Sequence, residues 1–256
     1  MSKSIIYYHR AYRKITGSGW LFLAELAVVT LPLSILVLFI YPSITEQMGR
    51  IAQTVLSSYY LPGTIKVIGQ SFLLGNISIV SIPGTHPTAF VSFVNFIISL
   101  ALIVFLPYTK RGRNIAIYVV FLAVINLVSA LYFTLSPVAF PYTATDFSEL
   151  YVKTEISMWL FIPLILGMAF LPLPAPIFPK LLLIVFALMY SVIFGTLRYI
   201  IFLFIISKLS VIYMALLFFA FGPLIDFVYI VGIYCFYTSK LAKNLKGSET
   251  VWKWLY

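Results

Sequence analysis

Long apolar stretches separated by short polar segments are the main pattern of this chain. A helix needs about 20 consecutive apolar residues to cross the hydrocarbon layer of a membrane. Six stretches come close to or exceed this length and predict transmembrane helices; they cover residues 20–40, 89–107, 115–136, 158–178, 181–207 and 211–237. The pattern therefore predicts an all-α polytopic membrane protein, in which residues 1–256 form a single integral membrane domain.

The segment 42–88 is the longest polar segment, and a lysine, two amides and several glycines interrupt the apolar residues of its middle part, 64–84. In this middle part, β-branched residues alternate between Gly69, Gly75 and Gly84, a pattern typical of short strands. We therefore expect two or three strands here, forming a small extracytoplasmic β-element.

Prolines indicate where two of the predicted helices end or bend. The fourth helix is expected to stop near Phe170, because four prolines follow it and leave an extended segment leading to Lys180; they are Pro172, Pro174, Pro176 and Pro179. In the sixth helix, Gly222-Pro223 is expected to produce a kink.

Composition and charge support the membrane interpretation. Hydrophobic residues make up 62% of the chain and charged residues 9%, whereas soluble domains have about half and about a quarter. The net charge of +10 comes from lysines and arginines in short loops and in the two tails, as in cytoplasmic segments of membrane proteins. We therefore expect contact with the lipid bilayer and no nucleic-acid partner.

The loop charges also predict an orientation. The loop after the second helix is basic and is expected in the cytoplasm, whereas the loop before the fourth helix has a net negative charge that suits the outer face; the acidic loop carries Asp146, Glu149 and Glu155 against Lys153. We expect a multi-pass protein of the cell membrane with both termini in the cytoplasm.

Few side chains are suited to cofactor chemistry. Membrane-bound haem usually takes two axial histidines from within helices, but His9 lies in the N-terminal tail and His86 in a loop. Cys235 is the only cysteine and cannot form a multi-cysteine metal site. We expect no cofactor, no metal and no catalytic residue, and although the sequence leaves enzyme activity open, it favours a protein without one.

Arg198 is the most informative residue, because it lies inside the apolar stretch 181–207. An unpaired charge inside a membrane costs at least a few kcal/mol, so a partner is expected, and Asp226 in the next stretch is the best candidate. In antiparallel neighbouring helices the two residues would differ in depth by only several ångströms. We predict a buried ion pair, with a structural role favoured over a proton or substrate site.

Three further polar residues fall inside predicted helices: Asn95, Asn126 and Glu25. An amide such as that of Asn126 hydrogen-bonds a neighbouring helix more often than it binds a ligand. Glu25 lies about 8 Å along the helix from Trp20, near enough to the inner interface to be hydrated. A structural role is expected for it.

Parts of the chain resemble the exosortase and archaeosortase family, membrane-embedded cysteine enzymes that process C-terminal sorting signals of exported proteins. In that family an extracytoplasmic strand leads to a Cys-Ser-Gly or Cys-Thr-Gly motif, followed by a helix with Asn-x-x-Arg and a later histidine. One register places Ile82-Pro83-Gly84 over the cysteine motif and Asn126-Leu127-Val128-Ser129 over Asn-x-x-Arg.

A second register places Glu155 or Ile156 over the cysteine, Gly195-Thr196-Leu197-Arg198 over Asn-x-x-Arg, and Asp226 near the histidine. Neither register supplies a cysteine, and the thiolate is the nucleophile in such enzymes. The resemblance therefore implies a degenerate relative without that activity, in envelope or exopolysaccharide export.

Three functions remain open from the sequence. The leading hypothesis is a non-catalytic subunit or assembly partner of a multi-protein membrane complex, with other integral membrane subunits as partners, because catalytic groups are lacking. The alternatives are a permease-type transport component that uses Arg198 and Asp226, and the degenerate exosortase-like protein.

Overall fold

The computed structural model describes residues 19–60, 63–108, 113–136, 140–173 and 175–244. Its helices are α1 (Gly19–Ser57), α2 (Ala89–Phe105), α3 (Arg113–Leu135), α4 (Ala144–Phe170), α5 (Ile177–Lys208), α6 (Met214–Phe221) and α7 (Pro223–Asn244). Two strands, β1 (Lys66–Phe72) and β2 (Gly75–Ser81), and two short 3₁₀ turns, η1 (Leu106–Tyr108) and η2 (Val211–Tyr213), complete the described elements. The predicted fold class, all-α with a small β-element, is confirmed.

Five helical segments of the described chain are long and apolar enough to cross a membrane: Phe22–Ser57, Ile115–Leu135, Ala144–Phe170, Ile177–Lys208 and Val211–Leu241. The chain is therefore a multi-pass membrane protein. Helix α2 is also apolar but has only 17 residues, at the lower limit for a span. A sixth span stays a prediction.

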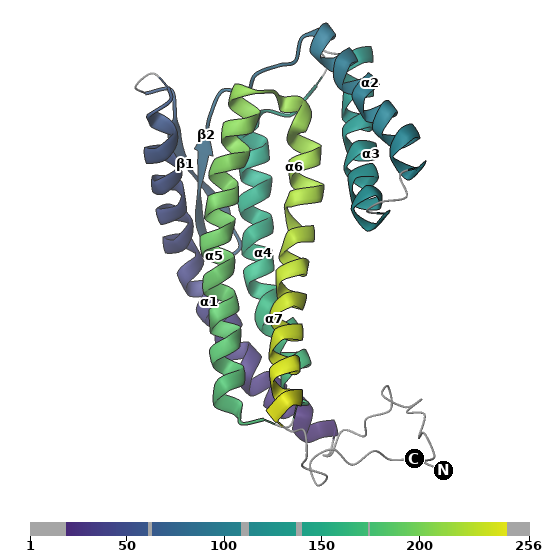
Figure 1. Ribbon diagram of the computed structural model, residues 1–256. Coiled ribbons are helices and arrows are strands. Elements are labelled where there is room, and N and C mark those ends of the chain that lie inside the picture. The colour runs from purple at the N-terminus through teal and green to yellow at the C-terminus, as the bar shows by residue number, and fades with distance from the viewer. Residues whose placement is uncertain (1–18, 61–62, 109–112, 137–139, 174, 245–256) are drawn as a thin grey trace, which may run out of the picture.

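The long helices form a bundle with two distinct ends (Figure 1). Helices α1, α4 and α5 and the α6–α7 segment run along its length, and the strands lie beside α1 in one half, which we call the β-hairpin end. Helices α2 and α3 form an antiparallel pair beside this same half, with α3 packed against η2 and α6. Helix α1 begins and α7 ends at the opposite, terminal end.

Helix α1 is much longer than expected. It runs for 39 residues, so residues 43–57, expected in the polar β-segment, are helical instead. Pro42 lies inside the helix, and Thr45 Oγ1 donates a hydrogen bond to its carbonyl at 2.9 Å. Glu46 and Arg50 form an exposed ion pair at 2.5 Å, the i,i+4 pairing that stabilises a helix in water. The polar residues therefore mark a hydrated helix.

The expected strands form a two-stranded antiparallel sheet, in which Lys66 pairs with Ser81 and Phe72 with Gly75. The bundle satisfies the free edge of β2, because Val80 N donates to Tyr199 OH at 2.8 Å and to Ser148 Oγ at 3.2 Å. Exposed strand edges otherwise leave backbone groups unpaired. The sheet is thus fixed against α4 and α5.

Helix α4 begins well before the predicted start at residue 158. Thr143 accepts a hydrogen bond from Asp146 N at 3.2 Å, and the Asp146 carboxylate accepts one from Thr143 N at 2.7 Å. This capping box satisfies two backbone donors at the helix start. The acidic segment predicted as a loop is therefore largely the first half of α4, whereas the predicted end at Phe170 is confirmed.

Two predictions need correction: the start of the fifth helix after Lys180 and the kink at Gly222-Pro223. Helix α5 begins at Ile177, before Lys180, because Pro179 falls in its first turn, where a backbone N–H has no partner within the helix. The predicted kink is a full break, since α6 ends at Phe221 and α7 begins at Pro223. A Cβ on Gly222 would lie 2.3 Å from Phe218 O, so only glycine fits this break.

Candidate functional site

The break between α6 and α7 supplies backbone acceptors inside the bundle. Proline has no N–H and cannot continue the helical hydrogen-bond ladder. Ile225 N donates to Gly222 O at 3.0 Å, so Phe221 O is left for another donor. Arg198 Nη1 donates to Phe221 O at 2.9 Å and to Gly222 O at 2.8 Å. The end of α6 thus binds a cation, as the negative end of a helix dipole favours.

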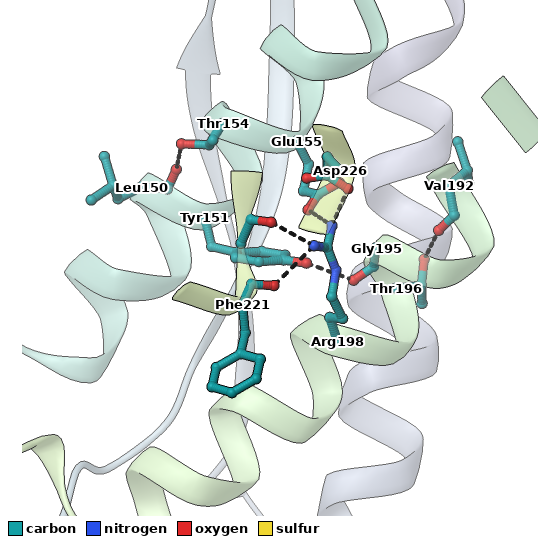
Figure 2. Close-up of polar contacts among 11 residues, drawn as sticks. Leu150, Tyr151, Thr154, Glu155, Val192, Gly195, Thr196, Arg198, Phe221 and Asp226 are labelled. Carbon is teal, nitrogen blue, oxygen red and sulfur yellow. Dashed lines mark hydrogen bonds and ion pairs between the residues drawn. The ribbon is translucent and has the colours of Figure 1, made fainter. Parts of the chain in front are cut away.

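The second terminal nitrogen of Arg198 contacts two carboxylates (Figure 2). Nη2 donates to Asp226 Oδ1 at 2.6 Å and to Glu155 Oε1 at 2.7 Å. The structure therefore brings together Arg198 and Asp226, the two residues singled out in the sequence, and adds Glu155 from α4. We call these three residues the charged cluster. They are 4%, 1% and 2% exposed, respectively, so the contacts lie in the interior.

Small residues on α5 make room for the cluster. Ser191, Gly195 and Arg198 follow the i, i+4, i+7 spacing that places residues on one helix face. A Cβ on Gly195 would lie 2.6 Å from Glu155 Oε2, so the absence of a side chain lets the carboxylate approach α5. Tyr151 OH donates to Gly195 O at 3.0 Å and closes the same contact between α4 and α5.

The cluster contains one positive and two negative side chains. The Phe194 ring lies 5.0 Å from the guanidinium carbon of Arg198 and adds a cation–π contact. Asp226 stands in the first turn of α7, where a helix dipole favours a negative charge. Three atoms of the cluster nevertheless lack a well-aligned hydrogen bond in the described chain: Arg198 Nε, Glu155 Oε2 and Asp226 Oδ2.

The two asparagines form a separate polar contact between helices. Asn126 Nδ2 donates to Ser99 Oγ at 2.8 Å and lies 3.5 Å from Asn95 Oδ1. Asn95 Oδ1 also accepts from Tyr213 OH at 3.1 Å. These bonds connect α2, α3 and η2, which is the helix–helix role expected for Asn126. Neither asparagine reaches the charged cluster.

Glu25 lies apart from both groups, on an exposed face of α1, and interacts electrostatically with Lys180. Lys180 Nζ itself donates to Leu171 O at 2.9 Å and to Leu173 O at 2.7 Å, so it caps the chain just after α4. Among the described residues, no group of three or more His, Cys, Asp or Glu side chains is placed to hold a metal ion.

A groove of about 670 Å³ opens near the β-hairpin end, between α4, α6 and the segment before α4. Its walls include the aromatic residues Phe140, Tyr142, Phe147, Phe218 and Phe219 and, on α4, the charged residues Asp146, Glu149 and Lys153. None of the residues of the charged cluster lines it. The groove and the cluster are therefore distinct features.

Sequence reasoning did not assign Glu155 to the ion pair, because this residue fell in a segment predicted as an outer loop. The signal that could have placed it is the Thr143-to-Asp146 spacing, a helix-start pattern. Comparisons add no relatives: no protein-family model, curated protein or solved structure matches this chain.

Proposed function

We propose that the protein is a non-catalytic integral membrane subunit, or an assembly partner, of a multi-protein complex in the cell membrane. The position of the α2–α3 pair is the observation that supports this function. The pair carries large exposed apolar residues along its length, among them Phe93, Ile97, Phe121 and Val128. It nevertheless stands beside the β-hairpin end of the bundle (Figure 1).

On α1 the exposed apolar residues are densest towards the terminal end, whereas α5 exposes large apolar residues along its whole length, from Ile177 to Phe204. Exposed apolar residues cover α1 from Trp20 to Ile40, about the thickness of a hydrocarbon layer at 1.5 Å per residue. Beyond Ile40 the same helix exposes the Glu46–Arg50 ion pair. A bilayer centred on the α1 band would leave part of the α2–α3 pair outside the hydrocarbon, although α3 is itself apolar enough to cross a membrane. Helices of another subunit would cover such a surface.

The proposed orientation follows from the same division. Lys240 and Lys243 lie near the end of α7, at the end of the bundle where α1 begins. Basic residues favour the cytoplasmic side. We therefore place the terminal end in the cytoplasm and the β-hairpin outside the membrane.

Site-specific photo-crosslinking tests the assembly role. A crosslinking residue is introduced at Phe93 or Val128 of the α2–α3 pair, and at Val28 of the α1 band as the matched control; these side chains are 53%, 66% and 73% exposed, respectively. We expect protein adducts at the first two positions and lipid adducts at Val28. Lipid adducts alone at all three, together with a monomer in native mass spectrometry of gently solubilised membranes, would reject the proposal.

A transport component is the second candidate, favoured by the break at Gly222 and Pro223 beside the charged cluster. Discontinuous helices with charged residues at the break form substrate and ion sites in many transporters. Replacing Arg198, Glu155 and Asp226 together by neutral residues of similar volume should then abolish solute flux in a folded protein. Unchanged flux would end this idea.

A degenerate exosortase-like protein is the third candidate. The second register of the resemblance placed Glu155 or Ile156 over the cysteine of that family, Arg198 over its arginine and Asp226 near its histidine. Of these residues, Glu155, Arg198 and Asp226 lie together in the cluster. This agreement supports a shared architecture in which a carboxylate stands where the family has its nucleophile. Proteins of envelope or exopolysaccharide export that co-purify with the chain would support this candidate over a transport role.

A further inference from the structure

The charged cluster is surrounded by oxygen atoms without well-aligned hydrogen bonds. Glu155 Oε2 and Asp226 Oδ2 accept no well-aligned hydrogen bond within the described chain, and the hydroxyls of Ser191 and Tyr229 make none there either, although Tyr229 interacts with Asp226 and Tyr151 with Glu155. Ser191 is completely buried and lies on the same face of α5 as Arg198. The Tyr229 hydroxyl lies beside both Asp226 and Ser191.

These oxygens belong to one small region. The two carboxylates share a single donor, Arg198 Nη2, at 2.6 and 2.7 Å, so Oδ1 of Asp226 and Oε1 of Glu155 can be only a few ångströms apart. Tyr229 follows Asp226 by one turn of α7, and Ser191 precedes Gly195 by one turn of α5. Four elements, α4, α5, α6 and α7, therefore enclose the site.

Charge determines what can complete this region. One guanidinium and two ionised carboxylates leave one uncompensated negative charge, and burying such a charge is strongly unfavourable. A buried water molecule could donate to the free carboxylate oxygens, but it would leave the charge unchanged. The region instead requires one more positive charge bound by oxygen atoms.

We propose that the charged cluster, together with Ser191 and Tyr229, binds one monovalent cation, either Na⁺ or a proton. Both species supply a single positive charge to carboxylate oxygen, and Na⁺, as a hard cation, takes oxygen ligands in the way that Ca²⁺ and Mg²⁺ do. The inference goes beyond the assembly role and does not depend on it. Besides the two carboxylates, the ionisable groups that face the site are Arg198, which stays charged, Tyr229 on α7 and Tyr151 on α4.

Thermal unfolding of the full chain in lipid nanodiscs separates the two cations. For Na⁺, replacing choline chloride by sodium chloride at constant ionic strength should raise Tm, and each tenfold increase above Kd adds about 1.4 kcal/mol of stability. For a proton bound only in the folded state, Tm should fall as pH rises and should not respond to Na⁺. Radioactive ²²Na⁺ binding and infrared absorption of a protonated carboxyl group report the two cases directly on the unchanged protein.

Glu155→Gln is the decisive variant, because the amide removes the extra negative charge while keeping an acceptor for Arg198. If the Tm of the parent responds to Na⁺, we expect this variant to lose that response. If the parent binds a proton, we expect the variant to lose the infrared band and the dependence of Tm on pH. Glu149→Gln is the matched control, since Glu149 also lies on α4 and pairs with a cation, Lys153, but partly exposed; it should respond like the parent.

An identical response of the parent and Glu155→Gln to Na⁺ and to pH, without ²²Na⁺ binding or a protonated carboxyl band, would overturn the proposal. If Glu155→Gln fails to fold, Asp226→Asn takes its place as the test variant. The ²²Na⁺ binding and the infrared absorption of the parent then test the proposal directly. Flux and partner binding are measured separately, so failure here leaves the assembly role untouched.

Discussion

Neutralising Arg198 should destabilise the protein more than removal of an ordinary ion pair would, because this side chain donates to two carboxylates and two carbonyls. Breaking a buried pair by removing one partner costs about 3–5 kcal/mol. Arg198→Met also leaves Phe221 O without its donor, which adds about 1–3 kcal/mol. The expected loss of about 4–8 kcal/mol is comparable with the whole stability of many domains.

Combined substitutions test whether the three residues act as one group. Adding Asp226→Asn to Arg198→Met should recover only part of the loss, because Glu155 remains charged and unpaired. Adding Glu155→Gln as well removes the last uncompensated charge and should recover about 3–5 kcal/mol. The stability that is still missing in the triple variant is the cost of leaving Phe221 O without its donor.

Unfolding in mixed detergent micelles gives the free energy for each variant. Glu149→Gln with Lys153→Met, at a more exposed pair, is the control and should cost no more than about 1 kcal/mol. A triple variant as unstable as the sum of the three single variants would show that the residues do not interact, and the account of the cluster would be wrong.

Three smaller effects follow from local geometry. Gly195→Ala should cost about 1–3 kcal/mol in thermal unfolding, because its Cβ would meet a cluster carboxylate at 2.6 Å, whereas Gly232→Ala, in open space on α7, should be neutral or stabilising. Asn126→Leu should cost about 0.6 kcal/mol and should speed hydrogen exchange in α2 and α3 without altering that of α5. Leu73→Gly should raise Tm, because Leu73 has a φ of 51° in the β-hairpin turn, a region that favours glycine. Leu74 does not have a positive φ, so Leu74→Gly should not raise Tm. Equal effects of the two substitutions would argue against turn strain.

The sequence predicted those elements whose determinants are local. Apolar stretches indicated where helices lie, because no other regular structure except a closed barrel satisfies its backbone within a membrane. Alternation between glycines indicated the strands, and the prolines after Phe170 indicated the end of α4. Arg198 and Asp226 were found because a charge among apolar residues stands out.

The errors concern helices that continue into water. The second half of α1 and the first half of α4 are polar enough to be predicted as loops, because hydropathy alone cannot distinguish a hydrated helix from a loop. Their helical signals are pairs of residues, Glu46 with Arg50 and Thr143 with Asp146. Glu155 was missed for this reason, since its burial depends on a helix whose beginning was placed too late.

The depth of the charged cluster is set by a backbone feature rather than by its charges. Pro223 interrupts the helix and Gly222 allows the chain to turn there, which frees Phe221 O at that level. An arginine can donate to this carbonyl and to two carboxylates at once because its guanidinium carries five N–H groups in a fixed plane. A lysine at position 198 would present one nitrogen and could not span acceptors on both sides. Gly222→Ala should therefore disrupt the cluster although it changes no charge, by displacing the carbonyl that Arg198 Nη1 binds.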